Sequence, residues 1–254
     1  MRLKDKIAIV VGGASGIGYA VCEMFVKEGA TVVPADINGA KLPEIEAALK
    51  ALGNEKGYAV QCDMTDFEQV NALVSGVKEK LGRVDIMFCG GGASWNTPFA
   101  EMDVEEWNKM LHMHLDSAFY CAKAAASVMV PQNYGRLIFI SSGRAMRGDA
   151  AKVHYSAAKG GVMAFVRALG AELGPHGITV NSIAPGLTVT PLVQSQMSPE
   201  ALAAASASMP DKHLGRPEDI AALALLMASE DGGHINCQNW PVDGGDSVAS
   251  AKRI

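Results

Sequence analysis

The sequence predicts an α/β protein with a doubly wound, mostly parallel β-sheet and helices on both faces. Short β-branched runs alternate with longer stretches of helical spacing along most of the chain, and this alternation is typical of βαβ units. The strand-like runs are continuously apolar, which indicates strands buried on both faces. No repeat, low-complexity tract or linker interrupts the pattern, so we expect residues 1–254 to form one domain.

The expected strands share a β-branched, apolar composition, and most are followed by glycine, aspartate or another turn residue. The first of them runs directly into a glycine-rich turn, and the last closes on an Asp-Gly-Gly sequence. In chain order, the strands are expected at 7–11, 31–35, 57–62, 84–89, 136–141, 178–183 and 239–242.

The expected helices show apolar residues at helical spacing, and the last one has a proline in its first turn, where proline is favoured. The segment 187–215 is the least regular part of the chain, with only weak helical character over 189–208. It follows the carboxyl end of a strand, where ligands bind in such sheets, so we expect a mobile substrate lid there. The regular helices are expected at 17–27, 40–52, 66–81, 103–130, 153–173 and 217–228.

Composition narrows the function classes. The net charge is -5 and no basic block is present, which argues against a nucleic-acid partner. The five cysteines are widely spaced, with no C-x-x-C or Cys/His cluster, so we expect reduced thiols and no metal site. The polar start is too short for a signal peptide, and no apolar run approaches the roughly 20 residues of a membrane span. We therefore expect a cytoplasmic protein with no membrane partner.

A glycine-rich turn follows the first expected strand, with Gly12, Gly16 and Gly18 spaced as G-x-x-x-G-x-G. Because a strand enters this turn and a helix leaves it, backbone N–H groups and the helix dipole point at one place. That arrangement suits a pyrophosphate. The spacing differs from the G-x-G-x-x-G dinucleotide fingerprint, and such a turn can also be a simple βα connection.

Two aspartates end the next two strands. Asp36 can accept hydrogen bonds from both hydroxyls of an adenosine ribose, or it can be a turn residue that caps the next helix. Its charge would repel a 2′-phosphate, and neither Ser15 nor Ile37 supplies a compensating cation, so the sequence favours NAD over NADP. Asp63 can face the adenine edge or cap the helix that follows it.

Tyr155 and Lys159 lie four residues apart on an expected helix, which places the ammonium beside the phenol. Lowering the pKa of a tyrosine from about 10 to about 7 takes about 4 kcal/mol. One cation at about 5 Å supplies about 3.3 kcal/mol at an effective dielectric constant of about 20, and burial opposes it. We therefore expect Tyr155 to act as a base best when NAD⁺ is bound. Ser142, at the same sheet edge, can hold the substrate oxygen.

Together these residues resemble the short-chain dehydrogenase/reductase family over nearly the whole chain. The resemblance implies a seven-stranded Rossmann-type sheet and hydride transfer between an alcohol and a nicotinamide. It also implies a homotetramer built on the helices near 103–130 and 152–174. The motifs that carry it are Gly12-x-x-x-Gly16-x-Gly18, Asp36, Asp63, Ser142, Tyr155-x-x-x-Lys159, Asn181-x-x-Ala184-Pro185-Gly186 and Val242-Asp243-Gly244-Gly245.

The resemblance also implies which residues bind the cofactor, with Lys159 on the nicotinamide ribose and residues 183–188 around the nicotinamide. The implied NAD-binding set is Gly12, Ser15, Gly16, Ile17, Gly18, Asp36, Ile37, Asp63, Met64, Gly90, Gly91, Tyr155, Lys159, Pro185, Gly186, Thr188 and Thr190.

The chain departs from the family pattern at four places. Val11 replaces a threonine before the first glycine, 89–92 reads Cys-Gly-Gly-Gly instead of Asn-Asn-Ala-Gly, and 236–238 reads Asn-Cys-Gln instead of Thr-Gly-Gln. His114, seven residues after Trp107, aligns with the family's catalytic asparagine. We expect His114 either to take the asparagine's place in a proton relay from the lysine, as an imidazole titrating near neutrality, or to be a packed helix residue.

The substrate is the least determined part. Arg144 and Arg147 follow Ser142 in an expected loop, where they could clamp a carboxylate, phosphate or sulfonate, or remain solvated or at a subunit interface. The leading function is an NAD-dependent secondary-alcohol dehydrogenase or ketoreductase. The alternatives are a 3-oxoacyl thioester reductase and a catalytically impaired NAD-binding regulator. Besides Ser142 and Arg144, the expected substrate residues are Ser94, Trp95 and Leu187.

Overall fold

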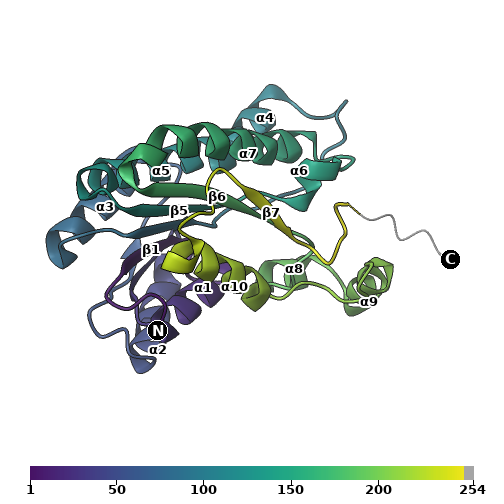
Figure 1. The fold of residues 1–254 in the computed structure, drawn as a ribbon. Helices are drawn as coiled ribbons and strands as arrows, with labels where there is room; N and C mark the ends of the chain where they lie inside the picture. Colours follow the sequence, from purple (N-terminus) through teal and green to yellow (C-terminus); the bar gives the residue numbers. More distant parts are fainter. Residues whose placement is uncertain (249–254) are drawn as a thin grey trace.

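Seven parallel strands form one sheet in the order β3-β2-β1-β4-β5-β6-β7 (Figure 1). The computed structural model describes residues 1–248. The strand order reverses between β1 and β4, which creates a crevice at the carboxyl ends of these strands. The doubly wound, seven-stranded sheet is therefore confirmed. The strands are β1 (Ile7–Val11), β2 (Thr31–Asp36), β3 (Val60–Gln61), β4 (Ile86–Cys89), β5 (Gly135–Ile140), β6 (Ile178–Pro185) and β7 (Asn239–Val242).

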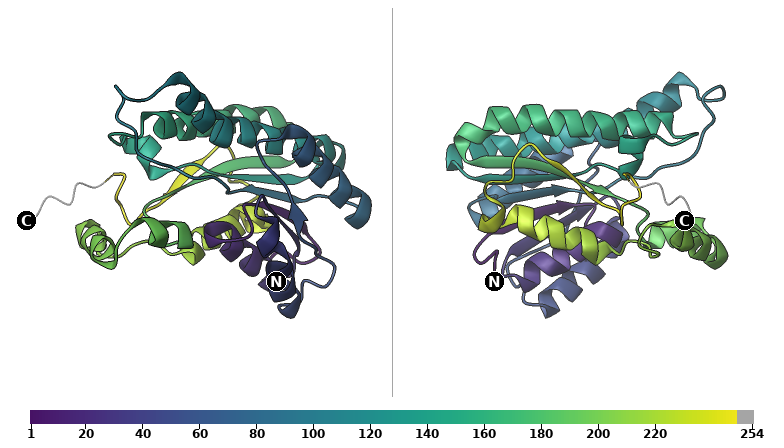
Figure 2. Two further views of the ribbon diagram at one scale, coloured as in Figure 1. Left: turned by 180° about the vertical axis from the view of Figure 1, so that it is seen from behind. Right: turned by 45° about the vertical axis from the view of Figure 1, so that its right-hand side comes forward.

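Helices cover both faces of the sheet (Figures 1 and 2). Successive side chains of the strands pack into two separate cores. In β1, Ile9 packs in the core under α3, α5 and α7, whereas Val10 packs in the core under α1, α2 and α10. This two-sided burial explains why the strands are continuously apolar. The helices are α1 (Gly16–Lys27), α2 (Leu42–Ala51), α3 (Phe67–Leu81), α4 (Val104–Leu111), α5 (Ser117–Gln132), α6 (Gly143–Arg147), α7 (Val153–Leu173), α8 (Pro191–Gln196), α9 (Pro199–Ser208) and α10 (Pro217–Ala228).

Two expected elements are wrong in extent. The long helix expected over 103–130 is divided by a π-helical turn, His112–Asp116, because the backbone there bonds one residue further along than in an α-helix. The third strand is shorter than expected, since only Val60 and Gln61 pair with β2. The residues before it bond instead to side chains and turns outside the sheet: the backbone N–H of Ala59 donates to Glu46 Oε2 at 2.7 Å.

The expected lid segment, 187–215, forms α8 and α9, which project at the same end of the molecule as α6 (Figures 1 and 2). The two ends of the segment are fastened together. Val189 N donates to Gly215 O at 2.8 Å, and Gly215 N donates to Leu187 O at 3.0 Å. These two hydrogen bonds join the ends of the segment at its base. Among the described residues, no helix has the length and apolarity needed to cross a membrane.

Candidate active site

The glycine-rich turn joins the carboxyl end of β1 to α1 and touches the loop after β4. Gly12 has φ +79°, and a Cβ atom there would lie 2.7 Å from Gly91 N, so only glycine allows this close approach. A Cβ at Gly18 would collide with the carbonyl oxygen of Gly12. Ser15, the residue before α1, makes no capping bond with its side chain, so the first N–H groups of the helix are available to an anion. This cradle fits a dinucleotide pyrophosphate.

Asp36 lies at the end of β2, beside the glycine-rich turn. Its Oδ2 accepts from Ala14 N at 3.1 Å and its Oδ1 accepts from Asn38 N at 2.9 Å, so the carboxylate is held by two backbone groups. Within residues 1–248, no lysine, arginine or histidine forms an ion pair with Asp36. Its negative charge is therefore not neutralised at the position where an adenosine ribose would be recognised.

Asp63 does not cap the helix that follows it, so that alternative is wrong. Asp66 caps α3, because its side chain accepts from the backbone N–H groups of residues 68 and 69. Asp63 Oδ1 instead accepts from the Thr65 backbone at 2.9 Å and the Thr65 hydroxyl at 2.7 Å. Met64 packs against the second glycine-rich loop, since a Cβ at Gly91 would lie 2.8 Å from its Sδ.

The segment after β6 approaches the same turn. A Cβ at Gly16 would lie 3.1 Å from Cγ2 of Thr190, which caps α8 by accepting from Val193 N at 3.3 Å. The hydroxyl of Thr188 donates to Gly186 O at 3.2 Å. The structure thus brings the predicted cofactor residues to one edge of the sheet. Of the remaining ones, Ile17 lies in the first turn of α1, Ile37 after β2, Gly90 after β4 and Pro185 at the end of β6.

The three expected catalytic residues come from two neighbouring elements. Ser142 begins α6 and its Oγ accepts from Arg144 N at 3.2 Å, whereas Tyr155 and Lys159 lie on α7. Lys159 Nζ is buried, donates to Ile140 O at 2.8 Å and lies 5.9 Å from the centre of the Tyr155 ring. The ammonium group of Lys159 therefore lies near both the phenol ring and the last residue of β5.

Burial is the main cause of the pKa shifts of Tyr155 and Lys159. Burial raises the pKa of Tyr155, although the hydrogen bond with Ser142 and the charge of Arg144 oppose the rise. Burial lowers the pKa of Lys159 to about 8. In the free protein Tyr155 is therefore a neutral phenol at neutral pH. This agrees with the expectation that Lys159 alone does not make it a base.

His114 lies in the π-helical turn, edge-on to the ring of Tyr155, with ring centres 5.2 Å apart. Its Nε2 lies 2.8 Å from the Ala93 carbonyl oxygen, which can only accept, so Nε2 carries the proton. Among the described residues, nothing bonds its buried Nδ1. Burial, together with the charge of Lys159, lowers the pKa of His114 to about 3. The expectation that His114 titrates near neutrality is therefore wrong, because the imidazole is desolvated beside a cation.

Arg144 and Arg147 do not lie in a loop, because the Ser142 cap starts helix α6 there. Each arginine is paired with an aspartate: Arg144 with Asp149, and Arg147 with Asp246 at 2.7 Å. These intramolecular pairs compete with the expected anion clamp.

The loop after β4 carries two other expected substrate residues, Ser94 and Trp95. Ser94 Oγ accepts from Lys152 Nζ at 3.1 Å. The indole N–H of Trp95 and the hydroxyl of Thr97 both donate to Oε1 of Glu106 on α4. Sequence reasoning missed Lys152 and Glu106, because neither stands in a motif and both are recognised only through their partners. Leu187, by contrast, lies at the base of the α8–α9 segment, where its carbonyl oxygen accepts from the backbone.

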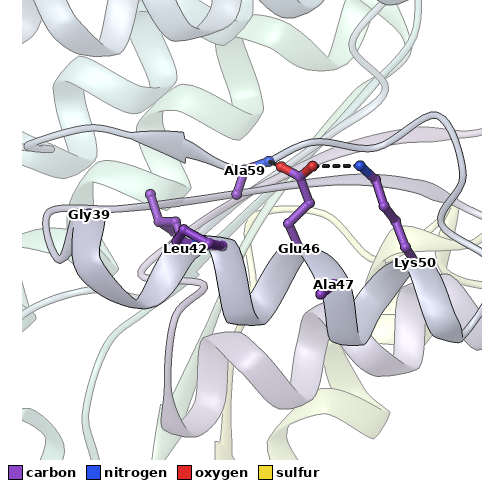
Figure 3. A pocket seen from close by; sticks show the side chains of 7 residues that line it. Gly39, Leu42, Glu46, Ala47, Lys50 and Ala59 are labelled. Carbon is purple, nitrogen blue, oxygen red and sulfur yellow. Dashed lines mark hydrogen bonds and ion pairs between the residues drawn. The ribbon is translucent and has the colours of Figure 1, made fainter.

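A hollow elsewhere on the molecule has no comparable chemistry. It lies over α2, and the polar groups in it bond to one another: Glu46 accepts from Lys50 Nζ at 2.6 Å and from Ala59 N at 2.7 Å (Figure 3). Its lining residues include no serine, threonine, cysteine or histidine. The hollow is bordered by Gly39, Leu42, Pro43, Glu46, Ala47, Lys50 and Ala59.

Comparison with known proteins covers the whole of this framework. The family model described as enoyl-(acyl carrier protein) reductase matches residues 12–247. Nodulation protein G of Azospirillum brasilense is 36% identical over 248 residues, which cover 96% of this chain and 98% of that protein. The 3-oxoacyl-(acyl-carrier-protein) reductase of Thermotoga maritima is 30% identical over 246 residues, 96% of this chain and 99% of that protein. The solved structure of levodione reductase matches with TM-score 0.93 at 29% identity, covering 98% of this chain and 100% of that one.

Proposed function

This chain belongs to the short-chain dehydrogenase/reductase family, and from that premise we propose that it is an NAD-dependent oxidoreductase of secondary alcohols and ketones. The observation that carries the proposal is the meeting of Ser142, Tyr155 and Lys159 at the carboxyl end of the sheet, opposite the glycine-rich cradle. The family itself establishes an oxidoreductase that uses a nicotinamide cofactor. The proposal adds the preference for NAD, the substrate class and the residue roles.

The nicotinamide would supply the hydride acceptor or donor. Ser142 would hold the substrate oxygen through its hydroxyl, and Tyr155 would give that oxygen a proton in reduction or take one in oxidation. Lys159 would hold the nicotinamide ribose and stabilise the phenolate. Because burial holds the pKa of Tyr155 high, the phenol is ready as an acid, and as a base it needs the positive charge of NAD⁺ nearby.

His114 is proposed to take part in moving the proton away from Lys159, as a neutral group. Its Nε2–H is committed to Ala93 O, so the acceptor Nδ1 is the atom that a water molecule would approach. In this role the imidazole accepts a hydrogen bond and need not become charged.

NAD preference rests on Asp36. Two backbone N–H groups orient its carboxylate beside the glycine-rich turn, where it would accept hydrogen bonds from the ribose hydroxyls and repel a 2′-phosphate. The glycines, Asp63 and Met64, together with the segment 185–190, would hold the rest of the dinucleotide.

Reduction of 3-oxoacyl thioesters is the second candidate function. It is favoured by the likeness to the Thermotoga maritima reductase and by the description of the matching family model. The same catalytic residues would serve it, so only the substrate separates the two. A binding protein without turnover is the third, and the complete set of Ser142, Tyr155 and Lys159 weighs against it.

The proposal is tested by following NADH in a panel of secondary alcohols, ketones and 3-oxoacyl thioesters, half of the small molecules being anionic. Wild type is compared with Tyr155→Phe, and NAD with NADP. We expect Tyr155→Phe to lower kcat by about 10²- to 10⁴-fold while NAD still binds. Equal turnover by both proteins would overturn the catalytic assignment, and NAD binding without any turnover would favour the regulator.

A further inference from the structure

Lys152 is a buried cation that is short of partners. It precedes α7 and only 8% of its surface is exposed. Within the described part of the chain, its one side-chain hydrogen bond is to Ser94 Oγ at 3.1 Å. An ammonium has three donors. Across residues 1–248, no carboxylate forms an ion pair with it. Burying an unpaired charge is costly, so the free protein holds a positive charge that a ligand could neutralise.

The carboxylates around Lys152 are engaged elsewhere. Asp149 pairs with Arg144, and Glu106 accepts from the loop after β4 and lies 3.6 Å from Nε2 of His154. The other charged neighbours are cationic: burial and the charge of Arg144 both lower the pKa of Lys152. The surroundings therefore have an excess of positive charge, which favours an incoming anion.

The position of this charge matches the reaction site. Lys152 Nζ lies 5.8 Å from the centre of the Tyr155 ring, about as near as Lys159 Nζ at 5.9 Å. Lys159 Nζ donates to Ile140 O at the end of β5. Lys152 Nζ instead donates to Ser94, on the loop after β4 that carries expected substrate residues. An anionic group bound at Lys152 would thus stand only a few bonds from the oxygen that Tyr155 protonates.

We propose that Lys152 and Ser94 form an anion subsite that receives a singly charged carboxylate or sulfonate group of the substrate, close to its carbinol or carbonyl carbon. The inference rests on the dehydrogenase function proposed above and names its substrate class. One ammonium and one hydroxyl match one negative charge better than the two of a phosphate. This proposal replaces the anion site that the sequence suggested at Arg144 and Arg147, because both arginines are already paired with aspartates.

The first test compares 3-hydroxybutanoate with its methyl ester, which keeps the reacting carbinol but replaces the negative charge with a neutral methoxycarbonyl group. We expect Lys152→Met to lower kcat/KM for the acid by about 10- to 100-fold and to leave the ester unchanged, since a hydrogen bond to a charged group is worth about 1.5–3 kcal/mol. Lys152→Arg should retain the preference for the acid. Lys56→Met, which removes an exposed lysine far from Tyr155, is the matched control. Equal losses on acid and ester would mean a merely structural role and would overturn the proposal.

The second test needs no turnover. Calorimetric titration with butanoate, propane-1-sulfonate and propyl phosphate, in the presence of NAD⁺, measures anion binding directly. We expect the two monoanions to bind wild type and to lose at least about tenfold in affinity in Lys152→Met. Three results would each refute the subsite: no binding of butanoate or propane-1-sulfonate, tighter binding of propyl phosphate than of the monoanions, or equal affinities in wild type and Lys152→Met. If binding depends on Lys152 but neither acid nor ester is oxidised, the subsite stands and the proposed reaction fails.

Discussion

Desolvation governs the chemistry of single residues around Tyr155. It raises the pKa of the phenol, lowers that of Lys159 to about 8 and lowers that of His114 to about 3. All three shifts favour the uncharged form of the side chain, as expected for groups removed from water. Without a bound cofactor, these three side chains therefore carry less charge than the sequence motif alone suggests. A positively charged cofactor would favour the ionised form of Tyr155.

His114 makes the stability of the protein depend on pH. The folded-state pKa of about 3 lies below the ordinary value of 6.5. Between these values the unfolded chain binds a proton that the folded protein excludes, so the free energy of unfolding falls as the pH falls. The contribution is about 1.4 kcal/mol per pH unit, or about 2 kcal/mol between about pH 6.5 and pH 5.

Urea unfolding at these two pH values measures this effect. His114→Asn should lose less stability on acidification than wild type by about that amount, whatever its stability at neutral pH. Asn108→Ala, which alters an exposed and uncharged side chain on α4, is the control and should follow wild type. Identical pH dependence in wild type and His114→Asn would show that His114 is charged in the folded protein.

Asp36→Asn should relax the choice of cofactor. The amide keeps an oxygen acceptor for one of the two backbone N–H groups that hold Asp36, and it removes the charge that repels a 2′-phosphate. We expect the ratio of kcat/KM for NAD to that for NADP to fall by about tenfold or more, since one charge pair at close range is worth about 1–4 kcal/mol. Steady-state kinetics with both cofactors measures the ratio. An unchanged ratio would assign the preference to other residues.

At the scale of elements, the Glu106 carboxylate connects α4, the loop after β4 and the start of α7. Glu106 of α4 accepts from Trp95 and Thr97 in the loop after β4, and it lies 3.6 Å from His154 at the start of α7. The hydrogen bonds from Thr97 and Trp95 lower the pKa of Glu106, so it stays ionised at neutral pH. The loop that carries Ser94 is thus held in part by α4, through Glu106.

Glu106→Gln should loosen this loop. We expect the KM for the substrate to rise by about three- to tenfold, because one of the two hydrogen bonds is weakened, while the KM for NAD stays constant. Kinetics with each reactant varied separately measures the split. Glu105→Gln alters an exposed neighbour on the same helix and should change neither constant. A parallel rise in both KM values would indicate a general disturbance of α4 instead.

At the scale of the whole molecule, the outer surface of α5 carries an unusual side chain. Phe119 is 49% exposed, and it lies on one of the helices on which the family resemblance places the tetramer interface. Exposed aromatic side chains often mark interfaces between chains. We therefore expect Phe119 to be covered by a second copy of the chain.

Light scattering coupled to size-exclusion chromatography tests this expectation. Wild type should elute at four times the chain mass, and Phe119→Glu at one or two times, because a buried unpaired carboxylate costs several kcal/mol. Phe99→Glu, at a position 73% exposed outside these helices, should leave the mass unchanged. A tetramer of Phe119→Glu would place the interface elsewhere.

The order of the elements, the parallel sheet and the residues at its carboxyl edge can all be read from the amino-acid sequence. These follow from local patterns: apolar runs that suit two-sided burial, glycines where backbones touch, and a four-residue spacing that brings Tyr155 and Lys159 to one face of α7. Strand and helix positions were predictable for the same reason, except at the sheet edge, at the π-helical turn and at α6, where a loop was expected.

Which charged side chains have a partner of opposite charge depends on the three-dimensional structure. Arg147 pairs with Asp246 and Arg136 with Glu230 across long stretches of chain, whereas the Lys152 side chain hydrogen-bonds, among the described residues, only to Ser94. The pKa of His114 likewise depends on burial and on Lys159, not on its neighbours in sequence. Partners and desolvation are properties of three-dimensional proximity, which no local pattern of residues records. The proposed catalytic residues could therefore be located from the sequence, and the proposed anion subsite could not.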